Sequence, residues 1–238
     1  MLRQRAAQYI FLDDNLWIAR ALVCGFITAI LLESVFYSQG ECEDAKAARR
    51  EYDHQVSNQM CCSTEWIISI TGFTITGILA LMGVRTIYEA NHLGLMRCCC
   101  SEKEYRIQKA LSISIGLEGF GLIILSVFQM CWQIEMHAIG AFFFFLPGCI
   151  HIGILFFSID HIARDSVLTY IVEFSPCFLS FVAGVLRIFT GNYYAEWTLI
   201  AAIGAALLVT QIRLLRYDDE RNVISVSTSS PTKGEEDL

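Results

Sequence analysis

The sequence lacks the short motifs that mark the common soluble enzymes. It has no GxSxG nucleophile elbow, no HExxH zinc motif, no Walker-type phosphate loop and no Rossmann glycine fingerprint. It also has no excess of basic residues, because it contains 17 Lys and Arg residues and 24 Asp and Glu residues, which gives a formal net charge of −7. Nucleic-acid binding needs a basic face. From the charge we therefore expect no nucleic-acid partner. From the missing motifs we expect no metal and no cofactor, and no motif indicates an enzyme.

Long apolar segments are what the chain does contain. It is 55% hydrophobic, close to the proportion in soluble domains, so the distribution of these residues is more informative than their total. About 20 apolar residues cross a bilayer. Spans are predicted at 17–37, 66–88, 110–132, 137–158, 167–189 and 196–215. We expect an all-α, polytopic membrane bundle of six transmembrane helices, forming one domain over residues 1–216.

The basic residues predict the orientation of this bundle. Only Lys46, Arg49, Arg50 and Arg187 fall on one side of the six spans, and the other 13 of the 17 basic residues fall on the opposite side. The positive-inside rule then places both termini in the cytosol. Residues 217–238 are rich in Asp, Glu, Ser and Thr, so we expect a disordered cytosolic tail there.

Three cysteines lie in or beside the first loop on the non-cytosolic side. Residues 38–65 then face a lumen or the exterior, where disulfides form and persist. A bridge from Cys42 to either Cys61 or Cys62 is expected there, and the sequence leaves the pairing open.

A second cysteine group follows the second predicted span, on the cytosolic side. Cys98, Cys99 and Cys100 are adjacent to one another and lie among basic residues. Juxtamembrane cysteines of this kind are candidates for S-palmitoylation, and unmodified thiols are the equal alternative. A zinc site is disfavoured because the CxxC spacing is absent.

Three ionisable residues are predicted to lie inside the membrane. Glu118 lies about 12 Å inside the third span, and His151 lies on the opposite arm of the same predicted hairpin. Glu173 lies some six residues into the fifth span. Such groups are costly in lipid and suggest a functional site, such as a proton relay, a metal site or a head-group site. The alternative is a hydrogen-bonded cluster that only holds helices together, or a neutral glutamate.

His137 is expected at the luminal mouth of the fourth span. One interpretation is a luminal head-group site, and the other is an ordinary solvated histidine at the membrane interface.

The residues of the 110–158 hairpin resemble two related families of membrane proteins. Phe128 and Gln129, followed by His137 and then by Gly140 and Ala141, resemble the damage-regulated autophagy modulators. The Glu196-Trp197-Thr198 segment is similar to an EWT segment of that branch. Glu118, His137 and His151, at intervals of 19 and 14 residues, resemble the Golgi protein of GPI-anchor lipid remodelling. Together these are the Frag1/DRAM superfamily of six-span proteins with cytosolic termini.

The resemblance implies two functions of different kinds. The first is GPI-anchor lipid remodelling, or transport of GPI-anchored proteins, in the Golgi or another endomembrane. It would use a luminal head-group site at His137 and Glu196, with membrane lipids and GPI-anchored proteins as partners. The second is non-enzymatic regulation of autophagy or of a lipid-kinase complex, at the lysosome or plasma membrane, through cytosolic protein partners.

Overall fold

A computed structural model describes residues 16–39, 60–97, 102–157, 167–189 and 195–228, and every regular element in these ranges is an α-helix. No strand occurs in these ranges. The helices are α2 (Trp17–Gln39), α5 (Ser63–Arg97), α6 (Glu102–Val127), α7 (Ile134–Phe157), α9 (Val167–Phe189) and α10 (Ala195–Thr228). The predicted all-α class is therefore confirmed for the described residues.

Four of these helices are long and apolar enough to cross a membrane. Within the described ranges, the qualifying stretches are Trp17–Val35, Ser63–Tyr88, Lys109–Val127 and Ile134–Phe156. The apolar stretches of α9 and α10 are shorter, Cys177–Leu186 and Glu196–Ile212. The chain is thus an integral membrane protein by the length and composition of its helices.

The third predicted span ends earlier than expected. The sequence placed its end at residue 132, whereas α6 ends at Val127 and residues 128–133 form the turn into α7. The turn is tied to the start of α5, because Cys131 is disulfide-bonded to Cys61 and Gln129 Nε2 donates to Met60 O at 3.2 Å. These bonds join the turn to the residues that precede α5.

The expected disorder of the tail is wrong for its first half. α10 continues through residues 217–228, and residues 229–238 lie outside the described ranges. Adding residues to a nucleated helix costs little. Arg216 and Glu220 also have opposite charges at the i, i+4 spacing that stabilises helices.

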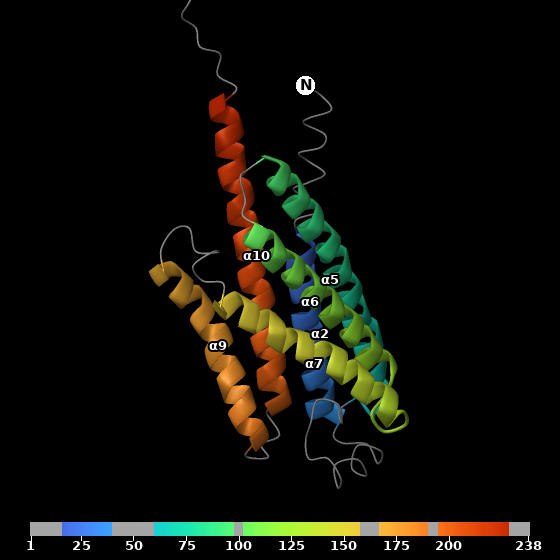
Figure 1. Cartoon of the computed structure of the whole chain (residues 1–238). Coiled ribbons are helices and arrows are strands. Elements are labelled where there is room, and N and C mark those ends of the chain that lie inside the picture. The colour runs from blue at the N-terminus through green and yellow to red at the C-terminus, as the bar shows by residue number, and fades with distance from the viewer. Residues whose placement is uncertain (1–15, 40–59, 98–101, 158–166, 190–194, 229–238) are drawn as a thin grey trace, which may run out of the picture.

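The described helices run alternately up and down the bundle (Figure 1). Each end of the bundle therefore holds the starts of some helices and the ends of others. α6 packs between α5 and α7, and α2 packs against α5. α10 contacts α9, α2 and α7, which closes the arrangement. α7 crosses its neighbours obliquely, and α9 lies at the periphery against α10 (Figure 1).

Glycines let α6 approach its two neighbours at the level of the backbone. A methyl group added at Gly119 would lie 2.9 Å from Gly77 O on α5. One added at Gly121 would meet Phe143 and Phe144 backbone atoms on α7, and one at Gly140 would lie 2.7 Å from Leu125 N. Small residues of this kind allow close helix contact in membranes. They also fix the position of Glu118, which directly precedes Gly119.

Side chains fill the interface among α7, α9 and α10. Phe156 of α7 stacks on Phe178 of α9 with ring centroids 5.4 Å apart, and it also meets Phe174. On α10, Ala202 and Ala206 are fully buried in the largest apolar cluster of the bundle. This interface is built from ring and methyl contacts, in contrast to the backbone contacts of α6.

Candidate functional site: a buried Glu–His–Thr chain

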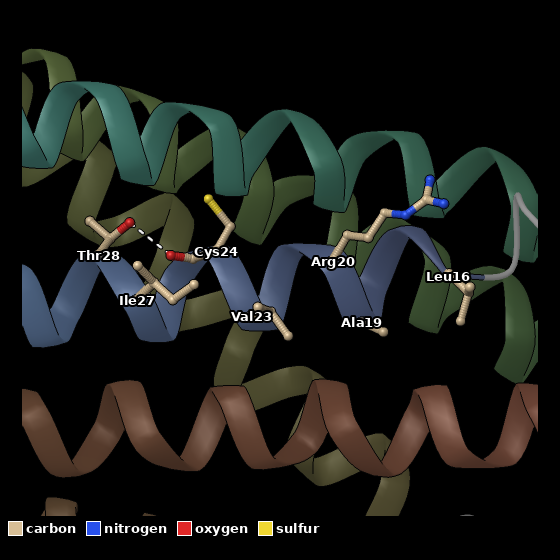
Figure 2. A pocket seen from close by; sticks show the side chains of 7 residues that line it. All are labelled: Leu16, Ala19, Arg20, Val23, Cys24, Ile27 and Thr28. Carbon is tan, nitrogen blue, oxygen red and sulfur yellow. Dashed lines mark hydrogen bonds between the residues drawn. The ribbon is translucent and has the colours of Figure 1, made fainter.

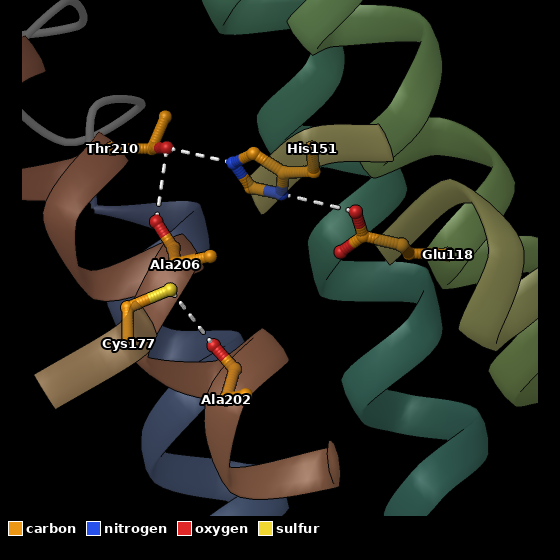
Figure 3. A network of polar contacts seen from close by, with 6 residues as sticks. All are labelled: Glu118, His151, Cys177, Ala202, Ala206 and Thr210. Carbon is orange, nitrogen blue, oxygen red and sulfur yellow. Dashed lines mark hydrogen bonds and ion pairs between the residues drawn. The ribbon is translucent and has the colours of Figure 1, made fainter. Parts of the chain in front are cut away.

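The structure brings Glu118 and His151 into direct contact in the interior of the bundle. His151 Nδ1 lies 3.0 Å from Glu118 Oε1 (Figure 3). Glu118 stands nine residues from either end of the apolar stretch Lys109–Val127, which corresponds to about 13 Å of helix rise. The carboxyl group therefore lies near the middle of its span.

Thr210 of α10 extends this pair into a chain of three side chains. His151 Nε2 lies 2.9 Å from Thr210 Oγ1, and the Thr210 hydroxyl donates to Ala206 O at 3.0 Å (Figure 3). All three side chains are buried, since none of the three residues is more than 6% exposed. The chain thus links α6, α7 and α10 through polar contacts.

The hydrogen bonds set the direction of this chain. A hydroxyl has one proton, and Thr210 donates it to the carbonyl of Ala206. His151 Nε2–H must then be the donor to Thr210 Oγ1. If the network carries no net charge, Nδ1 and Glu118 Oε1 have a single proton between them. A neutral network is the less costly state in a low-dielectric interior.

This direction distinguishes the chain from a catalytic triad. In a Ser-His-Asp triad the hydroxyl donates to the imidazole, which removes its proton during attack. Here the imidazole donates to the hydroxyl, and the chain ends at a backbone carbonyl. Thr210 is therefore not arranged as a nucleophile, and the chain is not a continuous proton path through the bundle.

One polar atom of the site has no hydrogen-bond partner among the described residues. Glu118 Oε2 is buried, while Oε1 contacts His151. An orphaned carboxylate oxygen is much more costly than an orphaned neutral carbonyl oxygen. Among the described residues, the Glu118 carboxyl group therefore gains hydrogen bonding through Oε1 alone.

The other residues proposed for the intramembrane and head-group sites are placed as follows. Glu173 lies within α9, but its side chain is outside what the structure describes. Glu196 lies in the first turn of α10. His137 lies in the first turn of α7 and is buried, with Nδ1 2.8 Å from Phe128 O. The interpretation of His137 as a solvated histidine is therefore wrong, because the ring is bonded to the turn beside it.

The cysteine pairing also differs from the expected one. Cys61 is bonded to Cys131, 70 residues further along, with Cα atoms 5.7 Å apart. The alternative bridge from Cys61 to Cys42 is thereby replaced. Cys62 is disulfide-bonded as well. Cys42 lies outside the described residues, so its pairing with Cys62 stays a prediction.

The palmitoylation candidates Cys98, Cys99 and Cys100 lie outside the described residues too. Within the described ranges, no group of three or more His, Cys, Asp or Glu residues is arranged to hold a metal ion.

Two residues of the site and its surroundings were missed by sequence reasoning. Thr210 is one of two threonines in the apolar stretch of α10, and such residues most often bond only to their own helix. Cys131 precedes Trp132, which looks like an interfacial residue at the end of a span. Neither has a sequence signal that separates it from its neighbours.

Comparison of the chain with protein-family models, with curated proteins and with solved structures finds no match.

Proposed function

We propose that this chain is a six-span protein of the secretory pathway with both termini in the cytosol. The Cys61–Cys131 disulfide supports this orientation, because disulfides persist in oxidising compartments. It joins the start of α5 to the α6–α7 turn, so this end of the bundle would be luminal. The start of α2 and the end of α10 lie at the opposite end (Figure 1), where most basic residues are also expected. The shorter apolar stretches of α9 and α10 would complete the six spans.

Within that pathway, the proposed role is in GPI-anchor lipid remodelling or in transport of GPI-anchored proteins. The contact between Glu118 and His151 carries the proposal. These are two of the three residues whose intervals resemble the GPI-remodelling branch, and they are the two that pair in the bundle. Buried ionisable groups are rare in membrane helices and are enriched where a function depends on them.

The proposed role is supportive rather than catalytic. No side chain of the Glu118–His151–Thr210 chain is reachable from lipid or water without helix movement, because all three are buried. The GPI anchor also enters the luminal leaflet, whereas Glu118 lies near mid-membrane. The site would therefore hold α6, α7 and α10 in the arrangement that handles lipid.

A second candidate is the non-enzymatic regulator of autophagy or of a lipid-kinase complex. The specific observation in its favour is the length of α10, which continues 16 residues beyond its apolar stretch ending at Ile212. At 1.5 Å per residue this extension is about 24 Å long. On the proposed cytosolic side, it would present a charged helix to a protein partner.

A knockout with surface staining of GPI-anchored proteins tests the first proposal. Reduced staining is expected, with rescue by the wild-type chain and weaker rescue by His151→Leu or Glu118→Gln. Thr76→Val is the matched control, since the Thr76 hydroxyl donates only to the Gly72 carbonyl of its own helix. Each rescue chain must retain the Cys61–Cys131 bond on non-reducing gels.

Normal surface display in the knockout, together with altered autophagic flux, would overturn the first proposal and favour the second. In that case, removal of residues 213–228 should abolish the regulatory effect while leaving the disulfide intact. Localisation adds a direct readout: the Golgi agrees with the first candidate, and the lysosome or plasma membrane with the second.

A further inference from the structure

The outer surface of α2 carries a groove that the buried site does not touch. It has a volume of about 480 Å³, and the described residues that line it are Leu16, which directly precedes α2, and α2 residues from Ala19 to Thr28 (Figure 2). This volume lies within the range of about 300–1,000 Å³ that is usual for small-molecule sites. α2 packs mainly against α5, with fewer contacts to α10, whereas Val23 and Ile27 beside the groove are exposed. On this side the groove would therefore open to the surrounding lipid.

The sequence of α2 explains why the surface is hollow here. Ala19 and Cys24 have small side chains, whereas Val23 and Ile27 project beside them and are 59% and 51% exposed. Thr28 closes the deep end. It is buried against α5, where a methyl group at Gly72 would lie 2.8 Å from its Cβ. Between Leu16 and Thr28 the helix rises about 18 Å, close to half the thickness of a bilayer core.

One end of the groove is charged. Arg20 is exposed and lies among the lining residues, one turn after the start of the apolar stretch at Trp17. Its guanidinium carbon is 4.6 Å from the centre of the Trp17 ring. Trp is characteristic of the membrane interface, and a guanidinium at that depth is positioned for a phosphate group. In Figure 2, Arg20 lies at the Leu16 end, while Ile27 and Thr28 lie at the other.

We infer that this groove binds one phospholipid with an anionic head group. Arg20 contacts the head group, and one acyl chain lies along Ala19, Val23 and Ile27. In the proposed topology this end of α2 meets the cytosolic leaflet, which is where anionic phospholipids are concentrated. The inference does not depend on the role in GPI-anchor remodelling, because the groove and the Glu118 site are on different helices.

Lipid retention by the purified full-length protein tests the inference. The protein in mild detergent is titrated with phosphatidylserine or with phosphatidylcholine of identical acyl chains, and bound lipid is counted by native mass spectrometry. The wild-type protein should retain phosphatidylserine about fivefold more tightly, which is the ratio that one interfacial basic residue supplies. Arg20→Gln should remove this preference and leave the weaker phosphatidylcholine binding.

Groove-filling variants test the acyl-chain part. Val23→Trp, or Ala19→Leu as a smaller change, should reduce retention of both lipids. The matched controls are Phe26→Trp, an exposed α2 position outside the lining, and Arg106→Gln, an exposed arginine of α6 at the same end of the bundle. Both controls should bind as the wild type does.

Three results would overturn the inference. The first is an unchanged phosphatidylserine preference in Arg20→Gln. The second is an equal affinity of the wild type for the two lipids, which would leave an acyl groove without head-group recognition. The third is efficient cross-linking through Cys24 between two copies in phosphatidylcholine vesicles, which would identify the occupant as a second chain.

Discussion

α6 and α10 both lie at the centre of the bundle, yet they meet their neighbours in different ways. At Gly77, Gly119 and Gly121, the backbone of α6 approaches the backbones of α5 and α7. On α10 the closest approaches are to side chains: a methyl group at Gly148 of α7 would first meet the Ile203 side chain, and one at Gly184 of α9 would lie closer to the Leu199 side chain than to the Leu199 backbone. Backbone atoms have nowhere to move, whereas an Ile side chain can change rotamer. The polar chain from Glu118 to Thr210 spans these two types of interface.

The largest effect is expected at the rigid interface. Gly121→Ala places a methyl group against Phe143 and Phe144 backbone atoms, and overpacking of this kind costs about 3 kcal/mol. Gly148→Ala on α7 is the matched change at the adaptable interface, and it should cost about 1 kcal/mol or less. Thermal unfolding in detergent measures both. Equal losses of stability would show that the two interfaces do not differ.

The next largest effect is expected in the polar chain itself. His151→Leu leaves the buried Glu118 carboxyl without its partner and should destabilise the bundle by about 2 kcal/mol. Glu118→Leu added to it removes the orphaned group, so the double variant should be more stable than the sum of the two single losses, by about 1–3 kcal/mol. Additive losses in the denaturation midpoint would contradict a direct interaction.

A smaller effect is expected where the chain reaches α10. Thr210→Val keeps the side-chain shape but removes the acceptor of the His151 Nε2 proton, at a cost of about 1–2 kcal/mol. Thr76→Val removes a hydroxyl that bonds only within α5 and should cost less than about 0.5 kcal/mol. Urea or thermal unfolding of the two variants side by side measures the difference. Similar losses would mean that the Thr210 hydroxyl does not couple α7 to α10.

The smallest effect should be a gain in stability. A methyl group added at Gly204 of α10 would make an ordinary van der Waals contact with Leu22 Cδ2 at 3.9 Å, with no closer neighbour. Gly204→Ala should therefore improve helix propensity without a clash, by at most about 1 kcal/mol. A loss in melting temperature would show that α10 packs as tightly as α6 does.

Features that depend on one segment of the chain were predicted from the sequence, and features that depend on contacts between distant segments were not. The bounds of α9 agree with the predicted span at 167–189, because apolar length is a property of a single segment. The predicted end of the third span is too late because Trp132 looks like an interfacial residue, whereas α6 ends at Val127 and Cys131 lies in the turn that is cross-linked to Cys61. The count of six spans and the cytosolic termini stay predictions.

The candidate site divides in the same way. Glu118 and His151 belong to one hairpin, so the depth of each along its arm was enough to suggest that they meet. Thr210 lies 59 residues beyond His151, and its place depends on how α10 docks, which no spacing in the sequence encodes. The disulfide between Cys61 and Cys131 depends likewise on the packing of α5 against α6, and cysteine connectivity cannot be deduced from spacing.

The position of Thr210 in the last helix has a consequence for biosynthesis. The ribosome releases α6 and α7 first, so Glu118 and His151 can pair before α10 has been made. Until α10 inserts, the Nε2 proton of His151 has no acceptor from Thr210, and the half-built bundle keeps an unsatisfied donor in the membrane. The arrival of α10 satisfies it. The final helix therefore completes the polar interior of the bundle as well as its apolar core. A nascent chain without α10 differs from the finished protein by the unsatisfied His151 Nε2 donor, and a membrane chaperone could recognise that difference.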